Sequence, residues 1–199
     1  LPFSNLRIDL FAGKNELSLD HITALCAGGV LSGKVVVAPE MGTFWGTLRI
    51  GNTDIRQWVA ETAFKEKKVS GTVDAEFREV RGSLSDPKTF EGEATLAMRD
   101  LYLWDMPLFY NMLSLKLFSF HTNPIFTTGL LRSRISGGKF IVEEVAFQGE
   151  DVDMRGNGKI GFDGSLDLVL NTRTKTVISG IPGVNILESA IDLVKDNIY

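Results

Sequence analysis

A two-residue period of hydrophobicity is the feature of this sequence that most limits how it folds. Apolar side chains occupy every second position over residues 6–10, 73–77, 94–98 and 166–170, and mostly polar side chains stand between them. Successive side chains of a strand point to opposite faces of a sheet, so each segment predicts a strand with one face in a core and one in water. Further strands are expected over residues 17–19, 35–37, 45–50, 140–147 and 154–162.

Turn residues separate these segments. Gly13-Lys14-Asn15 and Asp163-Gly164 stand between apolar runs and predict tight turns. Glu143-Glu144 interrupts the alternation of its segment and predicts a β-bulge. Gly156-Asn157-Gly158-Lys159 is glycine-rich but lacks the spacing of a phosphate-binding loop, and a hairpin turn is the better interpretation.

A weak internal repeat accompanies these turns. Gly13-Lys14 recurs as Gly138-Lys139, and Gly33-Lys34 recurs as Gly158-Lys159 at the same separation. The pattern suggests two copies of one strand-turn-strand unit, as in an elongated sheet assembled by repetition.

Three segments change to the period of a helix. Residues 55–67 carry apolar side chains three and four positions apart, with Thr53 or Asp54 available as the N-cap. Helices are also predicted from Asp105 to Phe118 and over residues 186–194. We therefore predict an α+β fold, predominantly β, in which a curved or elongated, groove-like antiparallel sheet is covered by two or three amphipathic helices.

Composition excludes several classes of function. The net charge of -4 and the lack of clustered Lys and Arg argue against a nucleic-acid partner. Cys26 is the single cysteine and lies in an apolar run, where a buried, inert thiol is favoured over a reactive one. His21 and His121 stand far apart, so we expect no metal and no cofactor.

No catalytic constellation is present in the sequence pattern. We find no nucleophile with a base, no paired carboxylates of a cleft and no phosphate loop, which predicts that the protein is not an enzyme. An acidic stretch offers carboxylates for calcium, although charged side chains on a solvated face explain it more simply; it comprises Glu143, Glu144, Glu150, Asp151 and Asp153.

Three stretches together resemble the C-terminal region of the bacterial AsmA-like family. They are KVSGTVDAEFREVRGS, FEGEATLAMRDLYLWDMPLFYNML and ISGGKFIVEEVAFQGEDVDMRGNGKIGFDGSLDLVL. The resembling features are a strand of Gly-x-hydrophobic type over Gly71–Phe77, a glycine-rich strand leading to an apolar helix over Gly92–Leu113, and a strand pair over Gly156–Leu170.

The resemblance implies a single module over residues 1–199, with possible sub-units at residues 1–68 and 69–199, in the periplasmic region of a longer protein anchored in the bacterial inner membrane by a preceding helix. It also implies a β-groove that takes part in phospholipid transport and outer-membrane homeostasis. The chain itself has no run of about 18 apolar residues that would span a bilayer, and it starts at Leu1 without an initiator Met, as expected of a segment.

The apolar positions of the alternating strands are the candidate site. A continuous apolar face offers acyl chains about 0.8 kcal/mol per buried methylene, so we expect a phospholipid or another acyl-chain ligand there. The alternative that the same side chains form a closed core stays open. The lipid-groove candidates are Val73, Ala75, Phe77, Leu96, Met98, Phe140, Val142, Leu166, Leu168 and Leu170.

A different class of function competes with lipid binding. An exposed sheet edge would let the module dock on another envelope protein through backbone hydrogen bonds. This second hypothesis predicts a protein partner and no lipid.

Overall fold

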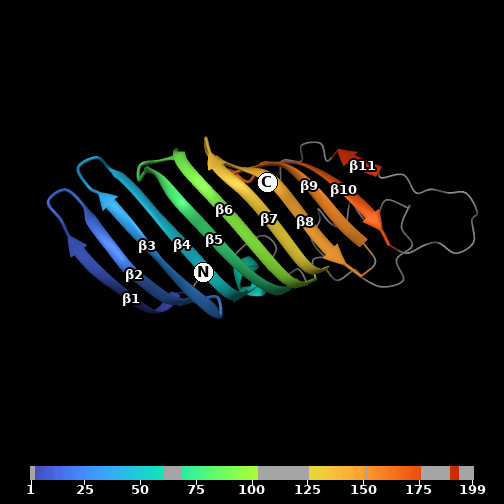
Figure 1. Ribbon diagram of the computed structural model, residues 1–199, viewed down its shortest axis with the longest axis horizontal. Coiled ribbons are helices and arrows are strands. Elements are labelled where there is room, and N and C mark those ends of the chain that lie inside the picture. The colour runs from blue at the N-terminus through green and yellow to red at the C-terminus, as the bar shows by residue number, and fades with distance from the viewer. Residues whose placement is uncertain (1–2, 61–68, 103–125, 151, 176–188, 193–199) are drawn as a thin grey trace, which may run out of the picture.

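The computed structural model describes residues 3–60, 69–102, 126–150, 152–175 and 189–192. These residues form one antiparallel sheet in which each strand pairs with the next along the chain, from β1 at one edge to β11 at the other (Figure 1). The elements are β1 (Phe3–Ala12), β2 (Leu17–Cys26), β3 (Gly29–Ala38), β4 (Thr43–Asp54), α1 (Ile55–Val59), β5 (Ser70–Ser83), β6 (Asp86–Tyr102), β7 (Phe126–Ser136), β8 (Lys139–Gly149), β9 (Val152–Gly161), β10 (Leu166–Thr174) and β11 (Ser189–Asp192).

The α+β class expected from the sequence is wrong. Strands make up 81% of the described residues and helix only 3%, so the fold is nearly all antiparallel β-sheet without the expected layer of two or three helices. Of the helix predicted over residues 55–67, Ile55–Val59 are helical, and residues 61–67 lie outside the described residues. Within the segment predicted as a helix over residues 186–194, Ser189–Asp192 instead form β11, which pairs with β10. The helix predicted from Asp105 to Phe118 lies outside the described residues.

The cross-strand register gives the sheet two chemically different faces. Val73 pairs with Met98 and Ala75 with Leu96, so the apolar positions of neighbouring strands fall on one side. We call this side the inner face. The side chains between them, such as Glu76 opposite Thr95, lie on the other side, which we call the outer face.

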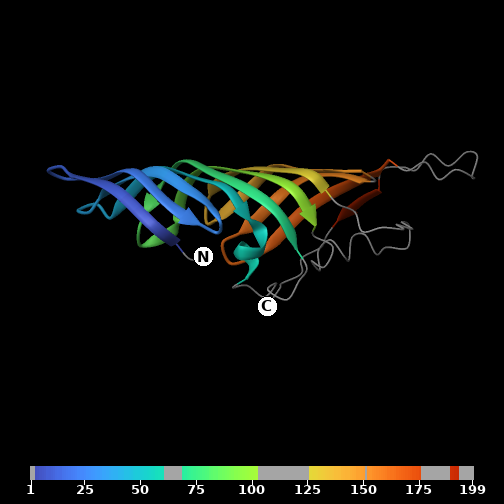
Figure 2. The ribbon, with the colours of Figure 1, turned by 90° about the horizontal axis from the view of Figure 1, so that it is seen from below.

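Bulges bend the strands toward the inner face. Asn5, His21, Asn52, Glu79 and Asp100 have φ between 49° and 58°, and each lies where the pairing register shifts. A bulge adds one residue to one strand, which bends that strand and increases the local twist. Figure 2 shows the result, a sheet that arches over α1. The bulge predicted at Glu143-Glu144 is also present, because the β8–β9 register shifts between Val142 and Val145.

Ion pairs cover the outer face. Arg99 Nη1 lies 3.0 Å from Asp74 Oδ2, Arg134 Nε lies 2.6 Å from Glu143 Oε1, and Arg132 Nη1 lies 3.4 Å from Glu144 Oε2. These side chains are largely exposed, and an exposed pair contributes only about 0–1 kcal/mol. The outer face is therefore kept in water, while the inner face supplies the packing.

The tightest packing on the inner face lies where the last strands meet β6 and β7. Leu101 and Val152 are fully buried, and Phe126 packs its ring 5.4 Å from that of Phe147. Ile55 of α1 packs against this cluster, so the short helix covers one end of the inner face. The buried members are Val69, Leu101, Phe126, Val142, Val145, Phe147, Val152, Met154 and Leu170.

The two halves of the predicted repeat take equivalent places in the sheet. Gly13-Lys14 lies in the turn before β2, and Gly138-Lys139 lies at the turn into β8. Gly33-Lys34 lies inside β3, and Gly158-Lys159 lies inside β9. The hairpin turn expected at residues 156–159 is therefore wrong, because these residues lie within β9. The turn expected at Asp163-Gly164 is confirmed and connects β9 to β10.

Strand pairing is continuous along the described chain. β4 and β5 pair over Thr43–Asp54 and Ser70–Ser83, so the sheet continues across the point where two sub-units were considered. Among the described helices, none has the length and hydropathy needed to cross a bilayer.

Candidate functional site

All ten lipid-groove candidates lie on the inner face. Ala75 of β5 is opposite Leu96 of β6, Phe140 of β8 is opposite Ile160 of β9, and Ile160 is in turn opposite Leu166 of β10. The alternation within each strand then places the remaining candidates on the same side. The structure thus brings together side chains from β5, β6, β8 and β10 that are up to about 95 residues apart in the sequence.

Burial divides the candidates into two groups. Val73, Ala75, Val142 and Leu170 are at most 3% exposed and belong to the packed part of the sheet. The other group is only half-buried and keeps apolar surface available to a ligand; it comprises Phe77, Leu96, Met98, Phe140, Leu166 and Leu168.

A straight row of apolar positions runs across the inner face at right angles to the strands. Each member lies directly opposite the next, strand by strand from β2 to β10; the members are Ala24, Leu31, Ile50, Ala75, Leu96, Leu131, Val145, Gly156 and Leu170. We call it the central row. Adjacent strands are about 4.8 Å apart, so the row is roughly 38 Å long. No charged residue interrupts it.

Of the central row, only Ala75, Leu96 and Leu170 were among the candidates predicted from the sequence. Leu131 was missed because no strand was predicted over residues 126–136, where two consecutive leucines, Leu130 and Leu131, hide the two-residue period. Ile50 lies in the strand predicted over residues 45–50, whereas Leu31 precedes the strand predicted over residues 35–37. The face on which each lies depends on the pairing of β3 with β4 and of β4 with β5. The alternation of Leu48 and Ile50 with Arg49 in β4 was the sequence pattern that could have identified Ile50.

Aromatic rings line the inner face near one end of the strands. The ring centroids of Phe44 and Phe90 are 5.1 Å apart, those of Phe90 and Phe162 are 6.3 Å apart, and those of Phe140 and Phe162 are 5.2 Å apart. Phe162 follows β9, whereas Phe90 lies three strands away on β6, a distance of about 14 Å in a flat sheet. The contact is possible because the sheet curves toward its inner face.

Glycines on the inner face make room for the large side chains beside them. A Cβ added at Gly156 would lie 2.6 Å from Leu170 Cδ2, and one added at Gly82 would lie 2.6 Å from Phe90 Cδ1. Leucine and phenylalanine side chains therefore lie over glycine backbone on the concave side, where space is scarcest. The candidate site depends on these glycines as much as on its apolar side chains.

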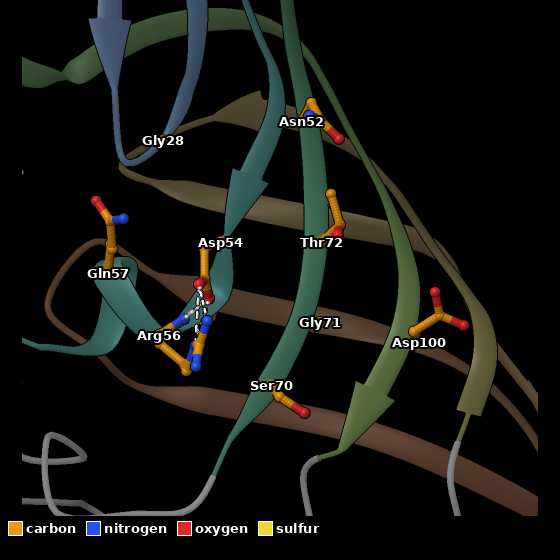
Figure 3. A pocket seen from close by; sticks show the side chains of 9 residues that line it. All are labelled: Gly28, Asn52, Asp54, Arg56, Gln57, Ser70, Gly71, Thr72 and Asp100. Carbon is orange, nitrogen blue, oxygen red and sulfur yellow. Dashed lines mark hydrogen bonds and ion pairs between the residues drawn. The ribbon is translucent and has the colours of Figure 1, made fainter.

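A polar hollow of about 520 Å³ lies beside the apolar face, where the ends of β4 and β6 meet α1 and the start of β5 (Figure 3). Asn52 and Asp100, both at bulges, line it together with Ser70 and the ion pair of Asp54 and Arg56. His21, the histidine of the described chain, lies instead on β2 beside Asp9, so Ser70 has no imidazole base. The hollow offers polar contacts but no activated nucleophile within the described residues.

Asp54 fixes the start of α1 at the rim of this hollow. Its Oδ1 accepts hydrogen bonds from the backbone N–H of Arg56 at 2.9 Å and from Arg56 Nε at 3.0 Å. The side-chain hydrogen bond from Arg56 holds the pKa of Asp54 below its usual value. Asp54 is thus the N-cap, one of the two residues predicted for that place. Thr53 instead holds α1 to the sheet, since Thr53 Oγ1 donates to Val73 O at 2.7 Å and accepts from Trp58 Nε1 at 3.0 Å.

Replacing Asp54 by Ala is expected to lower the free energy of unfolding by about 1 kcal/mol at neutral pH, the usual effect of losing an N-cap. Because the folded state depresses the pKa of Asp54, this stabilisation is complete above the unfolded-state pKa and is lost as the pH falls through the folded-state pKa. Urea denaturation at a series of pH values measures both effects. Asp167→Ala, at an exposed position of β10, is the control, and an equal loss in both variants at neutral pH would refute the capping role.

The acidic stretch does not form a cation site within the described residues. Glu143, Glu144 and Asp153 lie 2.6–3.4 Å from the cationic groups of Arg134, Arg132 and Lys175, and Asp151 lies outside the described residues. No group of three or more His, Cys, Asp or Glu side chains suited to a metal ion occurs in this part of the chain. Cys26 is 1% exposed.

Comparison with known proteins found no matching family model, no matching curated protein and no matching solved structure. The candidate site is therefore interpreted from its own geometry.

Proposed function

We propose that the inner face binds the acyl chains of phospholipids and carries lipid along the sheet, as a non-enzymatic module of the AsmA-like kind in the periplasm of a bacterial envelope. The observation that carries the proposal is the central row, an uninterrupted apolar path across nine consecutive strands. The outer face carries ion pairs and single exposed apolar side chains such as Val30, Trp45 and Val169, whereas the central row lies on the inner face.

The size of the row suits an acyl chain. An extended chain of sixteen carbons is about 20 Å long, which is shorter than the roughly 38 Å of the central row. Such a chain would contact the half-buried members of the row, Leu31, Ile50, Leu96 and Leu131. The other side chains of the row are at most 5% exposed and lie beneath it; they are Ala24, Ala75, Val145 and Leu170. Burying ten of its methylenes against the inner face would gain up to about 8 kcal/mol, before the cost of restricting the lipid is subtracted. The half-buried Leu96 and Leu168 provide apolar surface for such contacts.

The test places a charge on each face of the same strand. Leu168 lies on the inner face of β10, and its neighbour Val169, which is 38% exposed, lies on the outer face. Native mass spectrometry of the purified chain, followed by organic extraction, is expected to find phospholipid in a defined ratio with the wild-type protein and with Val169→Asp. Leu168→Asp is expected to lose at least about nine tenths of it, because an ionised carboxylate beside the acyl chain would be desolvated.

A second pair separates loss of lipid from loss of fold. Leu96→Arg and Ala97→Arg place a cation on the inner and outer face of β6, and circular dichroism must show the same strand content in both variants. Lipid lost only from the inner-face variants supports the proposal. Wild-type protein that carries no phospholipid and takes none from vesicles of anionic phospholipid would refute it.

The open edge of β1 favours the second candidate function, docking through a sheet edge. β1 pairs with β2 alone among the described strands, and all ten of its residues are exposed. Its free backbone edge is therefore available for pairing with another strand.

A further inference from the structure

β1 is an edge strand with exposed apolar side chains. The exposed fractions of Leu6, Ile8 and Leu10 are 59%, 39% and 61%. Natural edge strands are commonly blunted by Pro, by Lys or by a bulge. β1 has a bulge at Asn5, and its pairing with β2 shifts again between Arg7 and Asp9, where the extra residue is His21 of β2. Residues 6–12 of β1 itself contain neither Pro nor Lys and no residue with positive φ. This segment can accept a further strand along its whole length.

The register with β2 assigns each side chain of this segment to a face. Leu10 is opposite Leu19, which belongs to the inner face, so Ile8 and Leu6 also lie on that face. Arg7 and Asp9 lie on the outer face. Apolar side chains and charges are thus separated on β1 as they are in the rest of the sheet.

The sequence of the segment is complementary to itself. Leu6-Arg7-Ile8-Asp9-Leu10 reads as apolar, positive, apolar, negative, apolar. If a second copy pairs antiparallel about a two-fold axis at Ile8, Arg7 of each copy lies opposite Asp9 of the other. The same register places Leu6 opposite Leu10 on the inner face. Opposite charges and apolar pairs at directly opposed positions each stabilise a sheet.

Neighbouring registers lack this complementarity. An axis at Arg7 or at Asp9 places like charges directly opposite each other, which is destabilising. An axis between two residues would place the inner face of one copy beside the outer face of the other, because directly opposed residues share a face. With the axis at Ile8, opposite charges lie opposite each other and the inner faces of the two copies lie on the same side.

Arg7 is free to make the new contact. It has no ion pair within the described residues, and its neighbour Asp9 contacts His21 through Oδ2 alone, at 2.9 Å. The other carboxylate oxygen of Asp9 is available to a guanidinium group from a second copy.

We propose that two copies of this chain associate through β1, antiparallel and with Ile8 on the two-fold axis, to form one continuous sheet. In that sheet the central rows of the two copies lie on the same face, on either side of the shared edge. The proposal names a partner for the open edge and does not depend on lipid binding.

Charge reversal on the whole chain is the first test. The wild-type protein is expected to show a concentration-dependent dimer by sedimentation velocity and by light scattering. Arg7→Asp, which places two acidic residues opposite each other, is expected to weaken dimerisation at least about tenfold, and the double variant Arg7→Asp/Asp9→Arg is expected to restore it. Lipid content, measured in parallel, is expected to be equal in the three proteins.

Disulfide trapping tests the register directly. Ile8→Cys is expected to form a disulfide with itself across the axis, whereas Leu6→Cys is expected to form one only when mixed with Leu10→Cys. The buried Cys26, 1% exposed, is left unchanged in all variants. A protein that stays monomeric throughout, a dimer insensitive to Arg7→Asp, or an edge that pairs only with a different protein would each overturn the proposal.

Discussion

Replacing Phe126 by Ala is expected to destabilise the protein by about 3–5 kcal/mol, the usual cost of removing a buried phenylalanine. Phe126 is 2% exposed and contacts the ring of Phe147, beside the fully buried Leu101 and Val152. The side chains around Phe126 are themselves buried, so removing its ring leaves a cavity that they can fill only by moving. Urea denaturation followed by circular dichroism measures the loss.

A phenylalanine on the other side of the molecule provides the control. Phe11 of β1 is 58% exposed, so Phe11→Ala is expected to change the free energy of unfolding by less than about 1 kcal/mol. If the two variants lose equal stability, the cluster around Phe126 is not the part of the inner face that holds the sheet together.

Adding a single methyl group at Gly156 is expected to cost about 1–3 kcal/mol or more. The added Cβ would lie 2.1 Å from the backbone oxygen of Val169 and 2.6 Å from Leu170 Cδ2. A backbone oxygen cannot rotate away as a side chain can, so β9 and β10 must separate. Thermal unfolding of Gly156→Ala, together with hydrogen exchange at β9 and β10, measures both the loss of stability and its location.

Gly51→Ala is the matched substitution in β4. Its Cβ would meet Asp74 Oδ1 at 3.6 Å, an ordinary contact, so the variant is expected to be as stable as the wild type or slightly more stable. Equal behaviour of the two alanine variants would show that glycine at Gly156 is not required by the close approach of Leu170.

Most of the strands were predictable from the sequence because alternation reports directly on a sheet with one apolar face, but no strand was predicted at β7. Residues 73–77 and 94–98 form facing strands as their period indicates, and the Asp54 cap and the Glu143-Glu144 bulge follow from local chemistry. These features depend on neighbours close in the sequence. Local patterns were therefore sufficient to predict them.

Features that depend on tertiary pairing were not predictable in the same way. Residues 189–192 have the spacing of an amphipathic helix, yet the edge of β10 offers them a ladder of backbone hydrogen bonds and they form β11. The glycines at residues 156 and 158 suggested a turn in the sequence. They lie instead within β9, opposite Leu170 and Leu168 of β10, and the need for glycine there depends on that pairing. The left-handed bulge at Glu79 carries no sequence signal, since glutamate does not favour that conformation, whereas His21 is of a residue type enriched there.

The apolar inner face was predictable in kind but not in extent. The ten candidates do share the inner face, because the period of each strand fixes which of its residues lie together. The central row could not be assembled from the sequence, since it requires the register of every pair of strands. Leu131 and Val145 join it only through that register.

The pairing of every strand with its immediate neighbours in the chain also determines how such a module can change in length. The order of the described strands in the sheet is their order in the sequence. A hairpin can therefore be gained or lost without changing how the other strands are connected. Each such event adds or removes two strands and lengthens or shortens the apolar path by about 10 Å. The reach of the sheet is therefore adjustable in discrete steps, whereas its width, fixed by strand length, stays the same.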